Sequence, residues 1–386
     1  MQAVSLILTA RVLGAAGYGA LAGSVALFMT FGQLSGLGSG VALVRHMARG
    51  GELYGRFAVT ERIYLLSGLV LLSLVLPLAI ILLGSVVPPA ALASFAIAEI
   101  LIAPALSPLA YRYQAQERMF LSSAIGTLAP MARLAAIASA AFLNLHDIAS
   151  FAQLYLTWLV PTVAFTLYAT WPRGDNSTTC NTRQAIREGL PYAISGVALT
   201  AGSELDKTVL LRLAGEAVTG PYAAAYRIAS AATLPVNALI LATVPRLFRA
   251  SSASNTRLAA IMLATVLGYA GIAAAALWLL APFAPWLLGK GFDKAAPLLR
   301  ALCIIIVTGS LRQYITALLT TRDLQASRNV IEISGVCISL VALFALVPIL
   351  GTSGAVLAVA ISDTVIILGG ATRVRKNNQS ETLHER

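Results

Sequence analysis

The stretch LLSGLVLLSLVLPLAIILL at residues 65–83 has no charged side chain over 19 positions. A helix that spans a bilayer needs about 20 mostly apolar residues. The hydrocarbon interior admits only helices and closed barrels, because it offers no water to backbone N–H and C=O groups. The stretch does not alternate apolar and polar residues with the period of two that a barrel strand needs. It therefore predicts a membrane-spanning helix.

The rest of the chain continues this pattern, with comparable apolar runs at residues 258–280 and 330–350. Of the 386 residues, 58% are apolar and 11% are charged, and the mean hydropathy is +0.81. An ordinary soluble domain has roughly 25% charged residues. The composition predicts an all-α, polytopic membrane protein. Breaks at charged or Gly/Pro-rich positions predict about twelve helices, over residues 1–13, 17–43, 60–84, 89–111, 119–143, 148–171, 188–212, 218–244, 257–283, 295–320, 329–349 and 352–372.

Basic residues gather in alternate loops between these helices. One side carries Arg45, Arg49, Arg56, Arg112, Arg118, Arg173, Arg183, Arg187, Arg246, Arg249, Arg257, Arg322, Arg328, Arg373, Arg375 and Lys376. The other side has only Arg212, Lys290, Lys294 and Arg300 near its loops. The positive-inside rule places the first side, and both termini, in the cytoplasm. The net charge of +11 is therefore explained by topology, and the sequence predicts no nucleic-acid partner.

The hydrophilic break at residues 171–188 divides the predicted helices six plus six. We expect an N-terminal lobe at 1–172, a cytoplasmic linker at 173–187, a C-terminal lobe at 188–373 and a cytoplasmic tail at 374–386. The halves share a weak repeat: LGAAGYGALA at 13–22 and LAGEAVTGPYAAA at 213–225 each precede a helix that closes on two arginines. Because six is even, the lobes have the same orientation, which predicts two pseudo-symmetric lobes around a central cavity. Chance similarity among Ala/Leu-rich helices is the alternative.

At these same residues the chain resembles the polysaccharide flippases of the multidrug/oligosaccharidyl-lipid/polysaccharide exporter superfamily. The residues Ala10-Arg11-Val12-Leu13-Gly14 followed by Gly17-Tyr18-Gly19 are similar to the opening motif of that family. Asp206, then 213–215 and GPYAAAYR at 220–227, resemble its mid-chain signature. Two later stretches also resemble sequence patterns of the family: LGKGFDKAAPLL at 288–299 and PILGTSGAVLAVAIS at 348–362.

The resemblance implies a transporter, not an enzyme, in the bacterial cytoplasmic (inner) membrane. It would carry undecaprenyl-diphosphate-linked repeat units of O-antigen, other lipopolysaccharide glycans or exopolysaccharide outward, by alternating access. Its partners would be the lipid-linked oligosaccharide, membrane lipids and the polysaccharide polymerase machinery, and we expect a monomer. The first helix has only about ten residues before Arg11, where the family has a full span. A late start codon and a degraded copy are the two explanations.

Basic residues inside the predicted helices are candidate ligands for the diphosphate. A charge at mid-bilayer costs at least about 2.5 to 3.5 kcal/mol, so those that persist face a partner or a watery cavity. Guanidinium groups match phosphate oxygens. Arg227, at mid-depth of its helix, is the first candidate, the resemblance adds Arg11, and Lys207 and Arg312 complete the set. The alternative is neutralisation by acids. Lys207 would pair with Glu204 on the same helix face, from which Asp206 points away, and Arg227 would pair with Asp206. For Arg312 the alternative is snorkelling or pairing.

Three acids are candidates for proton or sodium coupling: Asp206, Glu99 and Asp363. A desolvated carboxylate titrates near neutral pH, which suits a coupling role. Pairing across helices is the alternative. The glycines at 32, 36, 38 and 40 lack the strand and spacing of a nucleotide loop, so close helix packing or a hinge explains them better. The three cysteines have no pairing or metal spacing, and nothing in the sequence predicts a cofactor or metal.

Three other functions compete with the flippase. A membrane glycan polymerase or ligase would display reactive groups on sizeable outer loops, but here only His146 and Asp147 lie together on that side. A cation-coupled multidrug efflux pump shares the implied fold, but it would favour acids and aromatic residues over arginines. A lipid II flippase commonly has two more helices.

Overall fold

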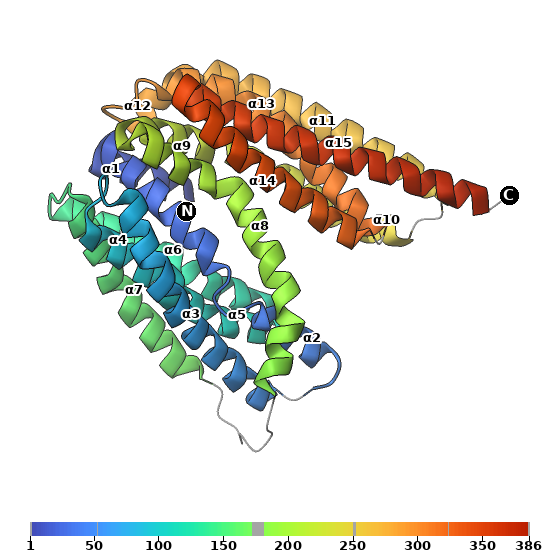
Figure 1. Ribbon diagram of the computed structural model, residues 1–386, viewed down its shortest axis with the longest axis horizontal. Coiled ribbons are helices and arrows are strands. Elements are labelled where there is room, and N and C mark those ends of the chain that lie inside the picture. Colours follow the sequence, from blue (N-terminus) through green and yellow to red (C-terminus); the bar gives the residue numbers. More distant parts are fainter. Residues whose placement is uncertain (1, 52, 172–180, 250–251, 323, 385–386) are drawn as a thin grey trace. The chain divides into compact units, whose positions relative to one another are not determined.

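The computed structural model describes residues 2–51, 53–171, 181–249, 252–322 and 324–384 (Figure 1). These ranges fold into helices joined by short turns and contain no β-strand. Contacts group the chain into two compact units, unit 1 at Met1–Ala217 and unit 2 at Val218–Arg386. The predicted all-α class is therefore confirmed.

Unit 1 is built from eight α-helices and two short helical segments of other types. The bounds are α1 (Gln2–Gly32), α2 (Ser39–Ala48), α3 (Leu53–Leu83), α4 (Pro89–Ala96), the π-helix η1 (Ile97–Ile102), the 3-10 helix η2 (Ala103–Leu106), α5 (Ser107–Ala115), α6 (Met119–Phe142), α7 (Ile148–Thr170) and α8 (Thr182–Ala214). The last helix, α8, packs against α1, α2 and α3.

Unit 2 begins at Val218, in the first turn of α9. Its elements are α9 (Glu216–Ala231), α10 (Leu234–Arg249), α11 (Ser252–Leu280), the 3-10 helix η3 (Ala281–Phe283), α12 (Ala284–Leu288), α13 (Ala295–Thr321), α14 (Gln325–Leu350) and α15 (Thr352–His384). Here α13 packs against α11 and α15, and α15 packs against α14.

Ten segments of the described chain are long and apolar enough to cross a membrane. Segment Ala3–Gly32 is one of them, although a kink at Gly14 divides α1 into two helices. The segments do not include α8, which carries Glu204, Asp206, Lys207 and Arg212 close together. Counting both arms of α1 and adding α8 gives the twelve predicted helices.

Helix α3 shows why this fold needs a bilayer. Its most apolar window has a mean hydropathy of 2.8, yet only 17% of that window is buried in the protein. Leu66 and Val70 are 65% and 59% exposed. A soluble helix presents polar residues on its outer face. The apolar outer face of α3 therefore lies against lipid.

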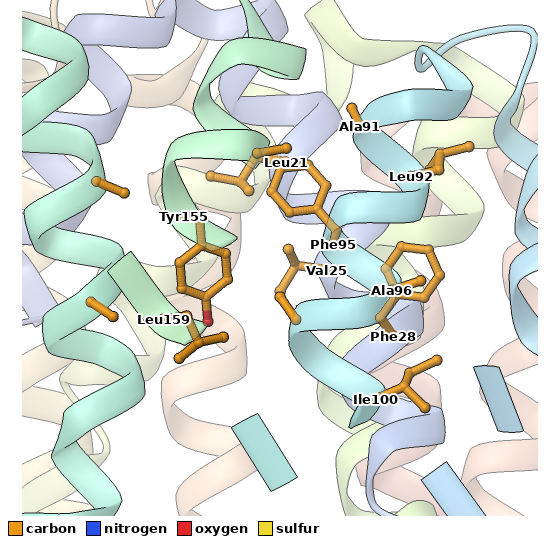
Figure 2. Packing of buried hydrophobic residues seen from close by; sticks show 14 of the residues in the cluster. Leu21, Val25, Phe28, Ala91, Leu92, Phe95, Ala96, Ile100, Tyr155 and Leu159 are labelled. Carbon is orange, nitrogen blue, oxygen red and sulfur yellow. The ribbon is translucent and has the colours of Figure 1, made fainter. Parts of the chain in front are cut away.

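The interior of unit 1 is a continuous apolar core (Figure 2). Val25 and Phe28 of α1 pack with Phe95 of α4, and the Phe95 and Phe151 rings lie 6.2 Å apart. Tyr155 and Leu159 of α7 close the same cluster. Three elements that are distant in sequence thus share one buried surface.

Several predicted boundaries need correction. Helix α3 begins at Leu53, seven residues before its predicted start, and α15 continues to His384, beyond its predicted end at 372. The predicted helix at 17–43 is wrong beyond residue 32, because turns at 33–38 separate α1 from α2. The predicted helix at 218–244 divides between Ala231 and Leu234. Helix α8 begins at Thr182, six residues before its predicted start. Residues 172–180, most of the predicted linker at 173–187, lie outside the described residues.

The four glycines of the FGQLSGLGSG stretch confirm the close-packing prediction. A Cβ at Gly38 would lie 2.1 Å from the carbonyl oxygen of Gly189 on α8. A Cβ at Gly40 would lie 2.1 Å from the Tyr111 ring, and one at Gly36 would lie 2.1 Å from the Tyr64 ring. At Gly32 the obstacle is the backbone oxygen of Glu99, at 2.6 Å. Each glycine lets another helix approach the chain.

The predicted repeat has a counterpart in backbone geometry. Gly14 has φ 68° and ψ −177°, and Gly215 has φ 83° and ψ 173°. Each glycine joins one helix to the next, and the two lie about 200 residues apart, as the sequence repeat does. Positive φ with ψ near 180° is essentially restricted to glycine. The shared conformation accords with the repeat, although Gly289, with φ 100° and ψ −166°, has a similar one.

Candidate functional site

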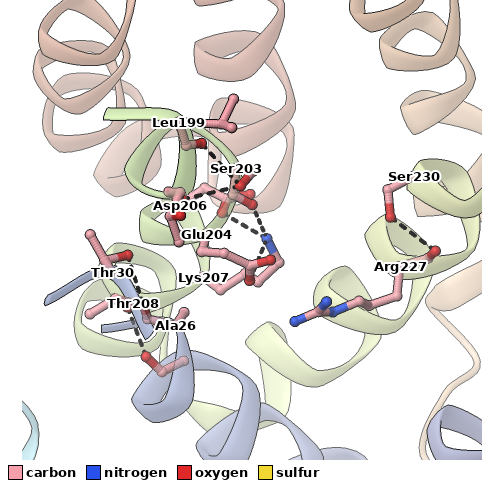
Figure 3. A network of polar contacts seen from close by, with 12 residues as sticks. Ala26, Thr30, Leu199, Ser203, Glu204, Asp206, Lys207, Thr208, Arg227 and Ser230 are labelled. Atoms are coloured by element: carbon pink, nitrogen blue, oxygen red, sulfur yellow. Dashed lines mark hydrogen bonds and ion pairs between the residues drawn. The ribbon is translucent and has the colours of Figure 1, made fainter. Parts of the chain in front are cut away.

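Lys207 lies at the centre of a polar network on α8 (Figure 3). Its side chain is fully buried. The Nζ atom donates to the Ser203 carbonyl oxygen at 2.6 Å and to Asp206 Oδ1 at 3.0 Å, and lies 3.5 Å from Glu204 Oε2. The predicted pairing of Lys207 with Glu204 is confirmed. The expectation that Asp206 points away from Lys207 is wrong, because its Oδ1 atom accepts from the same ammonium group.

Helix α8 is held in place next to this network. The Thr208 hydroxyl donates to the carbonyl oxygen of Gly23 on α1 at 2.7 Å. A Cβ at Gly23 would lie 2.7 Å from the Leu211 Cβ, so the two helices are in close contact. These contacts fix the part of α8 that carries Asp206 and Lys207 against α1.

Glu99 forms a second network with residues of two other helices. Its side chain lies in the π-helix η1 and is 8% exposed. Arg133 of α6 pairs with its Oε1 atom, and the Tyr155 hydroxyl of α7 donates to the same oxygen at 3.0 Å. The Arg133 guanidinium also lies 5.1 Å from the centre of the Tyr155 ring. Pairing across helices, the alternative left open by the sequence, is the arrangement found.

A double-mutant cycle tests this pair. We expect Glu99→Gln and Arg133→Gln each to destabilise the protein. The double variant should be more stable than the sum of the two losses predicts, by about 0.5 to 3 kcal/mol, since contacting residues couple over that range. The measurement is denaturant unfolding in detergent micelles. Pairing Glu99→Gln with Arg212→Gln, at the end of α8, is the control and should be additive. Additivity in the Glu99–Arg133 cycle itself would mean that this contact does not stabilise the fold.

Unit 2 contains a comparable network that joins two predicted site residues. Arg312 Nη1 of α13 lies 3.2 Å from Asp363 Oδ1 of α15. The Thr308 hydroxyl, one turn before Arg312, donates to Asp363 Oδ2 at 2.9 Å. Asp363 is 3% exposed and Arg312 is 23% exposed. The buried Asp363 carboxylate thus has an ion pair with Arg312 and a hydrogen bond from Thr308, while Arg312 itself remains partly exposed.

Arg227 and Arg11 lie in more open positions than these buried groups. Arg227 is exposed on α9, and its carbonyl oxygen accepts a hydrogen bond from the Ser230 hydroxyl at 3.0 Å (Figure 3). Tyr226 beside it packs on Tyr222, with ring centres 6.1 Å apart. Arg11 is exposed on the first arm of α1, three residues before the kink. Exposed guanidinium groups are accessible to a ligand.

Sequence reasoning missed two buried charges at the other end of unit 1. Arg56, expected in a loop, lies on α3, is 2% exposed, and has its Nη2 atom 2.8 Å from Glu188 Oε2 on α8. Glu61, one turn further along α3, is 3% exposed, and its Oε2 atom has no hydrogen-bond partner within the described ranges. A signal for the Arg56–Glu188 pair was present in the sequence. The two residues have opposite charges and lie near the starts of two helices on the same predicted side of the membrane.

Solved structures share this fold. The chain is similar to an inward-facing multidrug resistance MATE family transporter of the MOP superfamily, with a TM-score of 0.77, 14% identity and coverage of 98% of this chain and 96% of that one. It is similar to a MOP superfamily transporter from Pyrococcus furiosus at a TM-score of 0.61 and 16% identity, over 98% and 93% of the two chains. An outward-facing MATE transporter gives a TM-score of 0.56 and 15% identity, over 98% and 95%.

These likenesses show a transporter fold of the MOP superfamily. A family model described as polysaccharide biosynthesis protein matches residues 1–251. The chain belongs to this polysaccharide biosynthesis protein family, which confirms the resemblance found in the sequence motifs. The comparison with curated protein sequences found no match.

Proposed function

We propose that this protein is a flippase that moves undecaprenyl-diphosphate-linked oligosaccharide repeat units across the bacterial cytoplasmic membrane. The observation that carries the proposal is family membership over residues 1–251, combined with the transporter fold. A transporter fold in a polysaccharide biosynthesis family supports a lipid-linked glycan as the cargo. Basic side chains within its apolar helices match such a cargo, because guanidinium groups neutralise phosphate charge that cannot otherwise enter the membrane.

In this proposal Arg227 and Arg11 bind the diphosphate, since both residues are exposed. Lys207 and Arg312 share their charges with carboxylates, so each contributes to binding by exchanging a carboxylate oxygen for a phosphate oxygen. Asp206, Glu99 and Asp363 are the coupling carboxylates, because each lies beside a cation whose pairing changes when a proton or sodium ion binds. Arginine-rich loops support cytoplasmic termini, and the Gly14 and Gly215 geometry supports two repeats at 1–172 and 188–373.

Deleting the gene tests the function directly. We expect undecaprenyl-diphosphate-linked oligosaccharide to accumulate on the inner face, and the native chain to clear it. Arg227→Ala should clear it roughly 10- to 100-fold more slowly, because a hydrogen bond to a charged group contributes about 1.5 to 3 kcal/mol. Arg227→Lys should recover part of the rate. Arg212→Ala, an exposed arginine at the end of α8, is the matched control and should clear the intermediate at the native rate.

A second candidate is a cation-coupled multidrug efflux pump. The observation that favours it is the fold likeness to a multidrug resistance transporter, at a TM-score of 0.77. In that case the deletion strain accumulates no lipid-linked intermediate, its sensitivity to cationic compounds rises, and Arg227→Ala protects as well as the native chain does. This result would replace the flippase proposal.

A further inference from the structure

Helices α14 and α15 enclose a groove at the end of the pair that carries the C-terminus. The groove has a volume of about 450 Å³. Residues from the first two turns of α14, among them Ser327, Val330 and Ile331, form one wall. Gly369, Thr372, Arg373 and Lys376 of α15 form the other. All of these residues belong to unit 2.

The groove changes from apolar to basic along its length. The two helices are antiparallel, because they are joined through the turn at Gly351. Val330 and Ile331 therefore lie opposite Gly369. Ser327 lies opposite Thr372 and Arg373, nearer the start of α14 and the end of α15. Gly369 has no side chain, and a Cβ there would reach Ile331 at 3.4 Å, so the deeper part is a shallow apolar channel. The outer part has two cations and two hydroxyls.

No acid in the described part of the chain pairs with the cations of the groove. Arg373 and Lys376 are exposed, and neither forms an ion pair among the side chains that the structure describes. Glu332, the acid on the same part of α14, is instead paired with Arg328, whose Nε atom lies 3.1 Å from its Oε1 atom. Arg328 also donates to the Thr320 hydroxyl at 2.9 Å. Within the described residues, both cations at the outer end of the groove therefore remain without an acidic partner.

We propose that this groove binds an anionic phospholipid of the leaflet that faces it. An acyl chain would lie on Val330, Ile331 and Gly369, and the phosphate would contact Arg373 and Lys376. Basic pockets between membrane helices are suited to anionic head groups. The order of the surfaces, apolar in depth and cationic at the helix ends, matches the order of tail and phosphate in one lipid molecule. None of Arg227, Arg11, Lys207 and Arg312 lines the groove, and the proposal does not depend on the cargo of the transporter.

Native mass spectrometry of the purified full chain, with phosphatidylglycerol and phosphatidylcholine added separately, tests this proposal. We expect preferential retention of phosphatidylglycerol. The double variant Arg373→Gln/Lys376→Gln should weaken this retention about 25-fold, roughly five-fold for each cation removed near the surface. Arg375→Gln is the matched control, because this exposed cation on the same turn does not line the groove, and it should retain the lipid as the native chain does.

A second variant tests the apolar end. Gly369→Leu fills the channel beside Ile331 and should reduce retention of phosphatidylglycerol while leaving Arg373 and Lys376 in place. Two results would overturn the proposal. One is equal retention of phosphatidylcholine and phosphatidylglycerol, which would make the groove ordinary lipid-facing surface. The other is displacement of phosphatidylglycerol by millimolar inorganic phosphate, which would identify a simple anion site.

Discussion

Replacing Lys207 with methionine is expected to lower the free energy of unfolding by about 3 to 5 kcal/mol. The ammonium group is fully buried between Asp206 and Glu204, and Asp206 is 3% exposed. Removing the cation breaks its ion pairs with two carboxylates that are 3% and 12% exposed, and breaking a buried ion pair is strongly destabilising. Chemical denaturation in detergent micelles, followed by tryptophan fluorescence, measures the change.

Two further variants separate charge from packing at this site. Arg212→Met removes an exposed cation from the same helix and should change stability by no more than about 0.5 kcal/mol. Lys207→Met combined with Glu204→Gln and Asp206→Asn should recover much of the lost stability, because the buried acids are then neutral. If the triple variant is as unstable as Lys207→Met, the loss comes from packing, and the network does not have the role given to it here.

Gly38→Ala is expected to destabilise the protein by about 3 kcal/mol or more. Gly38 has φ 72°, and an alanine there costs roughly 1 to 2 kcal/mol from backbone conformation alone. The added Cβ would also lie 2.1 Å from the Gly189 carbonyl oxygen, a backbone atom that cannot rotate away. Overpacking of this kind costs typically 1 to 3 kcal/mol more.

Gly50→Ala is a matched control for that measurement. Gly50 has φ 78°, and a Cβ there would meet no atom within 4 Å. It carries the conformational cost of Gly38→Ala without the steric one, so the difference between the two variants isolates the contact of the α1–α2 turn with α8. If Gly38→Ala and Gly50→Ala lower the thermal unfolding temperature equally, the α1–α2 turn can move away from α8 without cost.

Much of the fold could be predicted from the sequence because lipid imposes a strong pattern. The run at 65–83 lies within α3, and the predicted ends of the sixth helix, at 148 and 171, match Ile148 and Thr170 of α7 to within one residue. The turns at 33–38 were missed although Gly36 and Gly38 lie there with positive φ. A membrane helix tolerates glycine, so composition alone does not separate a packed helical glycine from one that ends a helix.

The charged networks were predictable only where both partners lie on one helix. Lys207 and Glu204 are three residues apart, and that spacing indicated their contact. The partner of Glu99 is Arg133 on α6, and that of Asp363 is Arg312 on α13. Such pairs depend on which helices are neighbours, which is decided by packing over the whole unit. Arg56 was missed for the same reason, because its partner Glu188 lies 132 positions away.

The glycine turns at Gly14 and Gly215 have a consequence for chirality. Their φ values of 68° and 83°, with ψ values of −177° and 173°, are the mirror image of an ordinary extended residue. An added Cβ would meet no atom within 4 Å at either position, so space is not what restricts them. D-alanine, introduced by chemical ligation, would fit both turns without strain, whereas L-alanine would distort them. What these two positions require of a residue is handedness, and glycine is the one natural amino acid that has none.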